Sequence, residues 1–119
     1  MTEDPRRVLA RHGLAAKKSW GQNFLHDRSV LDRIVAAARA TADDVVVEIG
    51  AGLGTLTGAL ARAQPAPRRI LAIEREPDML AVLRAELGGE EPASRVELVE
   101  GDALEIGRAS CRERVCLLV

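Results

Sequence analysis

Residues 45–54 read Val-Val-Val-Glu-Ile-Gly-Ala-Gly-Leu-Gly, and this stretch decides the fold. Its first five residues form a short, β-branched run, which predicts a buried strand over 45–49. Three glycines then follow at alternate positions, Gly50, Gly52 and Gly54. Glycines after a strand let the backbone turn sharply and approach a ligand where a Cβ atom would clash. Residues 55–63 return to helical spacing, so the stretch predicts a strand, a tight loop and a helix.

The same alternation continues on both sides of this stretch. A helix is predicted over 27–40, with Asp27 or Ser29 as its N-cap. A second buried strand is predicted over 70–74, a helix over 77–87, and a third strand over 96–99. This order of elements predicts an α/β protein with a parallel sheet and right-handed crossovers. Residues 1–20 are polar and mostly aperiodic, so no element is predicted there.

The composition is that of a soluble globular domain. The chain has 119 residues, of which 47% are hydrophobic and 29% are charged, which argues against global disorder. No apolar run approaches the roughly 18 residues that span a bilayer, and there is no secretory signal. Both cysteines, Cys111 and Cys116, lie in the last nine residues, so no earlier cysteine-based metal site or disulfide framework is possible. We expect a cytoplasmic monomer with neither a metal ion nor a membrane partner.

Charge is unevenly distributed along the chain. Residues 1–40 have a net charge of +4, residues 41–105 of −7 and residues 106–119 of +2, which gives −1 for the whole chain. A basic N-terminal segment followed by an acidic one predicts that residues 1–40 bind a polyanion. The alternative is that these basic residues are merely solvated. Lys17 and Lys18 stand near Trp20 and Phe24, the only aromatic residues in the chain. This combination suits nucleic acid, whereas packing of both aromatics on the core is the alternative.

Acidic residues follow two of the predicted strands. Glu74 ends the second strand and Asp102 follows the third. Ligands of open α/β sheets bind at the carboxyl ends of the strands, where the glycine loop also lies. A carboxylate at Glu74 would accept both hydroxyl hydrogens of a ribose, and Asp102 would reach an adenine edge. The alternative for each acid is a helix cap or a solvated loop residue, but together they predict a nucleoside ligand.

Glu48 bears on which nucleoside ligand is bound. It lies two residues before Gly50, where its negative charge would repel the pyrophosphate of a dinucleotide. S-adenosylmethionine has no phosphate and carries a sulfonium cation and an ammonium group instead. The sequence therefore favours the methyl donor, and a dinucleotide-dependent oxidoreductase is the alternative.

Four motifs together resemble one known family. They are Lys-Lys-Ser-Trp-Gly-Gln-Asn-Phe-Leu at 17–25, Glu-Ile-Gly-Ala-Gly-Leu-Gly-Thr-Leu-Thr at 48–57, Ile73-Glu74 and Gly101-Asp102-Ala103. Over about residues 11–105 the chain resembles the KsgA-type ribosomal RNA adenine dimethyltransferases. The resemblance implies a Rossmann-like class I methyltransferase fold that uses S-adenosylmethionine. It also implies methylation of the exocyclic amine of adenines near the 3′ end of small-subunit rRNA, and hence the small ribosomal subunit as partner.

Lys17 and Lys18, which stand near the two aromatics, are predicted to contact RNA. The resemblance implies roles for other single residues. Six residues would bind S-adenosylmethionine: Asn23 and Leu25 in an arm that closes over it, Gly50 and Gly52 beside its amino-acid part, Glu74 at its ribose, and Asp102 beside its adenine.

Two other functions remain open at this point. The related antibiotic-resistance methylases modify large-subunit rRNA and share much of the pattern. The basic arm and the run over 52–57 favour the small-subunit type. A non-catalytic RNA-binding module that keeps the fold is the second alternative.

The C-terminal residues depart from the family pattern. The Asn-Pro-Pro-aromatic catalytic loop of the family is absent from the sequence, so no catalytic residue is assigned and we expect the fragment to be inactive. We therefore divide the chain into a basic arm over 1–26, the first half of a methyltransferase domain over 27–105, and a tail over 106–119. The tail resembles the translation of a sequencing-adapter oligonucleotide and fits no strand or helix. The sheet would then stop after its third strand and leave 45–49 with an unpaired edge.

Overall fold

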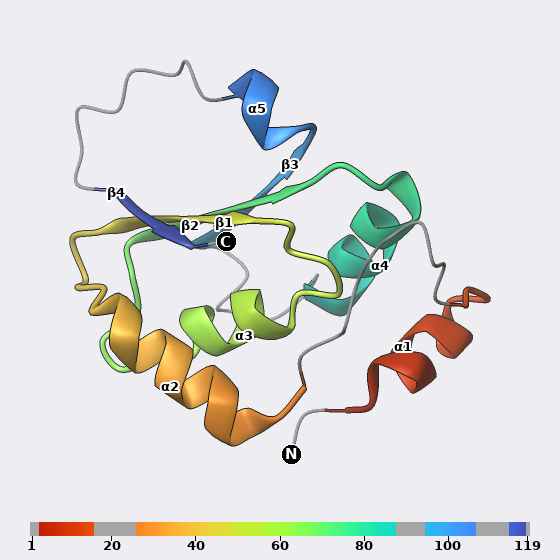
Figure 1. The fold of residues 1–119 in the computed structure, drawn as a ribbon, viewed down its shortest axis with the longest axis horizontal. Coiled ribbons are helices and arrows are strands. Elements are labelled where there is room, and N and C mark those ends of the chain that lie inside the picture. Colours follow the sequence, from red (N-terminus) through yellow and green to blue (C-terminus); the bar gives the residue numbers. More distant parts are fainter. Residues whose placement is uncertain (1–2, 16–25, 88–94, 107–114, 119) are drawn as a thin grey trace.

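The computed structural model describes residues 3–15, 26–87, 95–106 and 115–118, and contains one parallel sheet (Figure 1). Its strands lie in the order β3-β2-β1-β4. They are β1 (Val45–Ile49), β2 (Arg69–Glu74), β3 (Val96–Glu100) and β4 (Val115–Leu118). The α/β class, the parallel sheet and the first three strands are confirmed. Four residues with predicted roles lie outside the described ranges: Lys17, Lys18, Asn23 and Leu25.

Three helices lie on one side of the sheet: α2 (Arg28–Ala38), α3 (Thr55–Ala61) and α4 (Pro77–Leu87), as Figure 1 shows. The short helix α5 (Ala103–Ile106) lies away from them. The crossovers from β1 to β2 and from β2 to β3 step in the same direction. Right-handed connections of this kind place α3 and α4 on the same face of the sheet.

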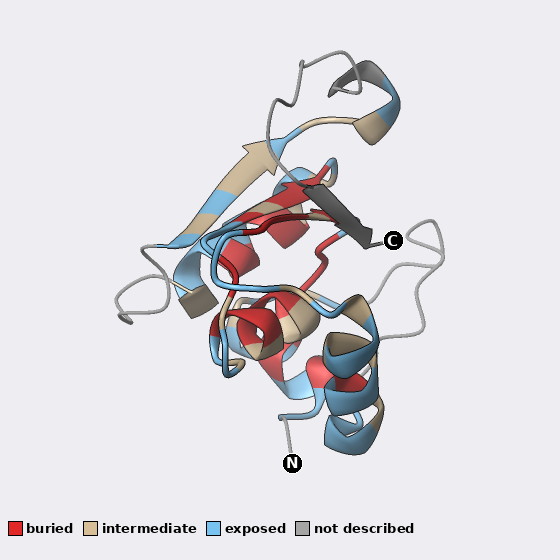
Figure 2. Ribbon diagram, turned by 90° about the vertical axis from the view of Figure 1, so that its left-hand side faces the viewer, coloured by how far each residue is buried: buried red, intermediate tan, exposed pale blue. Residues whose placement is uncertain are grey.

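The core lies between that face and the helices (Figure 2). Val46 and Ile70 occupy paired positions on β1 and β2, and both are fully buried. They pack against Leu60 and Ala61 of α3. Because side chains alternate along a strand, Glu48 and Ala72 lie on the same helix-covered face, two positions further along. This puts a carboxylate inside the protein.

The N-terminal segment forms a helix that the sequence analysis did not predict, α1 (Pro5–Arg11). Asp4 caps it by accepting a hydrogen bond from the Arg6 N–H at 2.9 Å, and Pro5 begins its first turn. The prediction of no element over 1–20 is therefore wrong for 5–11. The helix has seven residues and only two buried hydrophobic side chains besides its proline, Val8 and Leu9, so its apolar periodicity is too short to detect.

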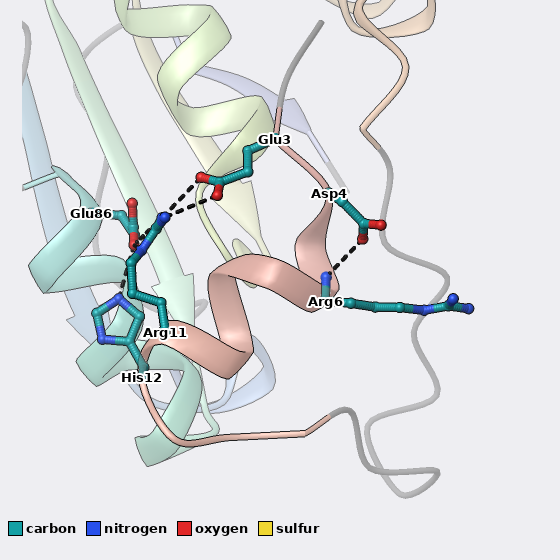
Figure 3. A network of polar contacts seen from close by, with 6 residues as sticks. All are labelled: Glu3, Asp4, Arg6, Arg11, His12 and Glu86. Atoms are coloured by element: carbon teal, nitrogen blue, oxygen red, sulfur yellow. Dashed lines mark hydrogen bonds and ion pairs between the residues drawn. The ribbon is translucent and has the colours of Figure 1, made fainter.

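Polar contacts join α1 to α4 on the surface (Figure 3). The Arg11 guanidinium donates to both Glu3 and Glu86, each at 2.9 Å. The His12 Nε2 lies 2.8 Å from the same Glu86 carboxylate. Beneath these contacts Val8 and Leu9 belong to one buried cluster with residues of the glycine loop and α4. The N-terminal helix is thus packed against the glycine loop and α4.

The tail contains a strand, contrary to expectation. β4 pairs in parallel with β1, with Val45 opposite Val115 and Glu48 opposite Leu118. The predictions that 106–119 form no strand, and that β1 has an unpaired edge, are therefore wrong. Val-Cys-Leu-Leu is a short apolar run of the kind that forms strands. Its backbone N–H and C=O groups pair with those at the edge of β1, which would otherwise be unpaired. Within the described ranges, no helix has the length and apolarity to cross a bilayer.

Candidate functional site

Backbone hydrogen bonds draw the carboxyl ends of β1, β2 and β3 together. The N–H groups of Gly50 and Ala51 donate to the Ile73 carbonyl at 2.8 and 3.1 Å. The Gly101 N–H donates to the Glu74 carbonyl at 3.1 Å. The loops after three strands are thus held at one edge of the sheet, where ligands of α/β proteins bind.

A recess of about 240 Å³ lies at this edge. Its lining includes Gly50, Glu74 and Asp102, so the structure brings together three of the residues predicted to bind a nucleoside. Gly52 does not line the recess but contacts Glu74. Pockets that enclose a whole ligand measure roughly 300–1,000 Å³, so this recess fits one part of a ligand of cofactor size.

Glu74 is buried at the end of β2, with 3% of its surface exposed. Its Oε2 accepts a hydrogen bond from the Gly52 N–H at 2.9 Å, and its Oε1 accepts one from the Glu76 N–H at 3.2 Å. A carboxylate has about four acceptor positions, so two remain for other donors. Glu74 can therefore hold the loop and accept two hydroxyl hydrogens of a ribose at once.

The glycine loop adopts backbone conformations that suit glycine. Gly50 has a φ of +73°, and a Cβ atom built on it meets nothing within 4 Å. Space therefore remains open beside the recess. Gly54 has a φ of +80°, and a Cβ atom there would collide with Leu83 of α4. The loop thus needs glycine at 50 for its turn and at 54 for close packing of α4.

Glu48 does not line the recess. It is 4% exposed, and its Oε2 accepts a hydrogen bond from the hydroxyl of Thr57, which is fully buried in the first turn of α3. Burial raises the pKa of Glu48 to about 7; the Thr57 hydrogen bond opposes this shift and the nearby Glu74 carboxylate adds to it. Glu48 therefore ties β1 to α3 behind the loop. Thr57 is the functional partner that sequence reasoning missed, although it lies within the run over 52–57.

Asp102 follows β3 and lines the recess. Its Oδ1 accepts a hydrogen bond from the Leu104 N–H at 2.9 Å, so it also caps the four-residue helix α5. The helix-cap alternative for this acid is thus correct. The cap orients the side chain at the edge of the recess and leaves the ligand role of Asp102 as a prediction.

Comparison with known proteins identifies the family. The profile of the ribosomal RNA adenine dimethylases matches residues 13–113 of this chain. The chain belongs to this family. The ribosomal RNA small subunit methyltransferase A of Anaeromyxobacter sp. (strain K) is 48% identical over 110 residues, which are 92% of this chain and 36% of that protein. The methyltransferase A of Myxococcus xanthus is 45% identical over 104 residues, 87% of this chain and 34% of that protein. This dimethylase-family chain therefore spans about a third of the length of these curated relatives.

Solved structures agree with the fold. The 23S rRNA methyltransferase ErmE is 34% identical, with a TM-score of 0.62 over 75% of this chain and 33% of ErmE. An RNA methyltransferase from Salinibacter ruber, solved in complex with S-adenosyl-L-homocysteine, is 27% identical. Its TM-score is 0.60 over 79% of this chain and 60% of that structure. The fold of this dimethylase-family chain is thus that of methyltransferases.

Proposed function

We propose that this chain is the cofactor-binding part of an S-adenosylmethionine-dependent rRNA adenine dimethyltransferase that acts on the small ribosomal subunit. The observation that carries the proposal is the meeting of Gly50, Glu74 and Asp102 in one recess at the carboxyl edge of the sheet. The names of the relatives from Anaeromyxobacter and Myxococcus support the small subunit as substrate.

In this proposal Glu74 binds the ribose of the cofactor. Its carboxylate is held in place by the Gly52 and Glu76 N–H groups, and about two of its four acceptor positions remain for other donors. Gly50 leaves room for the amino-acid part, and Asp102 lies beside the adenine. Asn23 and Leu25 would close over the cofactor, and Lys17 and Lys18 would contact RNA.

S-adenosylmethionine supplies an activated methyl group when bound, so the protein chiefly has to bind and orient the reactants. The exocyclic amine of adenine is a poor nucleophile because its lone pair is delocalised into the ring. A polar loop that accepts its hydrogens and an aromatic that holds the flipped base are needed as well. Since the sequence has no Asn-Pro-Pro-aromatic loop, we propose that residues 1–119 bind cofactor without transferring methyl groups.

Calorimetric titration with S-adenosylhomocysteine tests the cofactor assignment, with NAD as the control ligand. Saturable binding of S-adenosylhomocysteine, together with protection against heat, is the expected result. Binding of NAD alone would instead identify a dinucleotide-dependent enzyme. A domain that binds RNA and neither ligand would be the non-catalytic module.

Methylation of large-subunit rRNA is the second candidate, and the likeness to the 23S rRNA methyltransferase ErmE favours it. The two candidates differ in which RNA is labelled. A gene product that carries residues 1–119 together with the catalytic loop, given radiolabelled cofactor and unmodified rRNA of both subunits, should label small-subunit rRNA. Label confined to large-subunit rRNA would establish the second candidate.

A further inference from the structure

A groove of about 750 Å³ lies between α2 and α3 and is separate from the cofactor recess. Its floor includes Leu31 and Leu60, both buried. Three exposed arginines line it, Arg28, Arg39 and Arg62. Asp32 is the single acidic residue in its lining, so the described groove has a net charge of +2. Arg28 and Arg39 belong to the basic residues 1–40, whereas Arg62 lies within residues 41–105, whose net charge is −7.

The three arginines have no ion-pair partner in the described part of the chain. Other arginines do form ion pairs, for example Arg11 with Glu3 and Glu86, and Arg69 with Glu97. Guanidinium groups without a carboxylate partner remain available to an external anion. Arginine binds phosphate through two parallel hydrogen bonds, which suits it to phosphate more than to other ligands.

The groove runs from the cofactor edge of the sheet toward the opposite edge. Residues 39–44 join the end of α2 to the start of β1, so α2 runs back along the sheet (Figure 1). Arg28 therefore lies toward the carboxyl edge, whereas Arg39 and Arg62 follow the ends of α2 and α3 at the other edge. The eleven residues of α2 extend about 16 Å, which is long enough for several phosphates of a nucleic acid strand.

We infer that this groove binds the backbone of the RNA substrate and leads it to the methyl-transfer edge. Phosphates lie on the arginines and riboses pack on the apolar floor. No aromatic side chain is among the residues that line the groove, so bases do not stack there. Backbone contacts of this kind add affinity without sequence preference. The inference rests on the proposed function for the identity of the polyanion.

Titration of RNA with two triple variants of the complete chain tests the inference. One variant carries Arg28→Ala, Arg39→Ala and Arg62→Ala. The matched control carries Arg69→Ala, Arg84→Ala and Arg95→Ala, which removes three exposed arginines that neither line the groove nor belong to the basic residues 1–40. The groove variant should raise the dissociation constant for a small-subunit rRNA fragment about fiftyfold near 0.15 M salt, since three phosphate contacts at about 0.7 each change the salt slope of a single strand by about 2. Its slope of log affinity against log salt should fall by about 2.

Several outcomes decide the question. An equal loss for RNA of unrelated sequence supports backbone binding. Equal effects of the groove and control variants would overturn the inference, because net charge alone would then explain both. Unchanged RNA binding in the groove variant, together with a lower melting temperature, would also overturn the inference. The three arginines would then stabilise the fold rather than bind RNA. S-adenosylhomocysteine binding, measured on the same samples, separates a failure of this inference from a failure of the proposed function.

Discussion

The carboxylate of Glu74 accepts a hydrogen bond from the backbone N–H of Gly52 at 2.9 Å, although 22 residues separate the two in sequence. This bond fastens the loop after β1 to the end of β2. Because the same carboxylate lines the recess, loop geometry and ligand binding depend on one side chain.

Replacing Glu74 should therefore affect both stability and cofactor binding. Glu74→Ala leaves the buried Gly52 N–H without its acceptor, which costs about 1–3 kcal/mol of unfolding free energy. The loss of hydrogen bonds to a charged acceptor should weaken S-adenosylhomocysteine binding by about 1.5–3 kcal/mol. Calorimetry at a temperature where the variant remains folded measures the second effect.

Asp43→Ala is the control for this change, because Asp43 is an exposed acid near the opposite edge of the sheet. It should leave the dissociation constant unchanged. An unchanged constant in folded Glu74→Ala protein would refute the ribose role.

Gly50 should matter more for ligand binding than for stability. Gly50→Ala forces an L-residue to a φ of +73°, at a cost of roughly 1–2 kcal/mol, and adds a methyl group beside the recess. Gly13 has a similar φ of +70° with nothing within 4 Å of an added Cβ, but it lies after α1. Chemical denaturation should give similar losses for Gly50→Ala and Gly13→Ala, whereas only Gly50→Ala should lose affinity for S-adenosylhomocysteine. Equal affinities would show that the loop at 50 does not contact the ligand.

Glu48 makes stability depend on pH. Burial raises the pKa of this carboxyl from 4.5 to about 7. Below pH 4.5 the group is protonated in both states. Between pH 4.5 and 7 the unfolded chain ionises while the folded chain keeps its proton, so the free energy of unfolding falls as pH rises, by about 3 kcal/mol in total. Above pH 7 the loss is constant.

Glu48→Gln isolates this contribution, since the amide keeps an oxygen that accepts from the Thr57 hydroxyl but does not titrate. Urea denaturation at pH 5 and pH 8 should show a smaller decline for the variant than for the unaltered protein. Parallel declines would mean that other groups carry the pH dependence.

The sequence predicts the elements that have both a strong pattern and a long enough run. The strand over 45–49 and the helix over 77–87 have the predicted bounds, and Asp27 caps α2 as expected. The sequence did not predict α1, because the packing of this helix depends on Leu53, Met79 and Val82, which are distant in sequence. The Thr57–Glu48 hydrogen bond was not predicted for a related reason. Helical spacing shows on which face of the helix Thr57 lies, but not which strand residue its side chain contacts.

The contacts around Glu86 should stabilise α1 only modestly. The hydrogen bond from His12, and secondarily that from Arg11, lowers the pKa of Glu86. Their contribution is thus present above pH 4.5 and is lost as pH falls through the lowered pKa. Exposed ion pairs contribute about 0.2–1 kcal/mol, so Glu86→Gln should cost no more than this. Amide exchange across α1 should become faster.

Glu97→Gln is the matched control, because it breaks the exposed Arg69–Glu97 pair on β2 and β3 instead. It should leave exchange in α1 unchanged. High salt should reduce the effect of Glu86→Gln, since the Debye length is only about 3 Å at 1 M. Unchanged α1 exchange in Glu86→Gln protein would show that the buried cluster alone holds this helix.

The origin of residues 106–119 can be settled by a long read of the encoding DNA across the codon for Glu105. The sequence lacks an Asn-Pro-Pro-aromatic motif, and the chain spans about a third of its relatives. If residues 106–119 are a non-native tail, as their resemblance to an adapter translation predicts, the read should show a different fourth strand followed by that motif. Such a strand would take the place of β4 beside β1, where Val45 to Glu48 are paired. A read that reproduces residues 106–119 would instead make β4 the native strand, and the prediction that these residues are adapter-derived would be wrong.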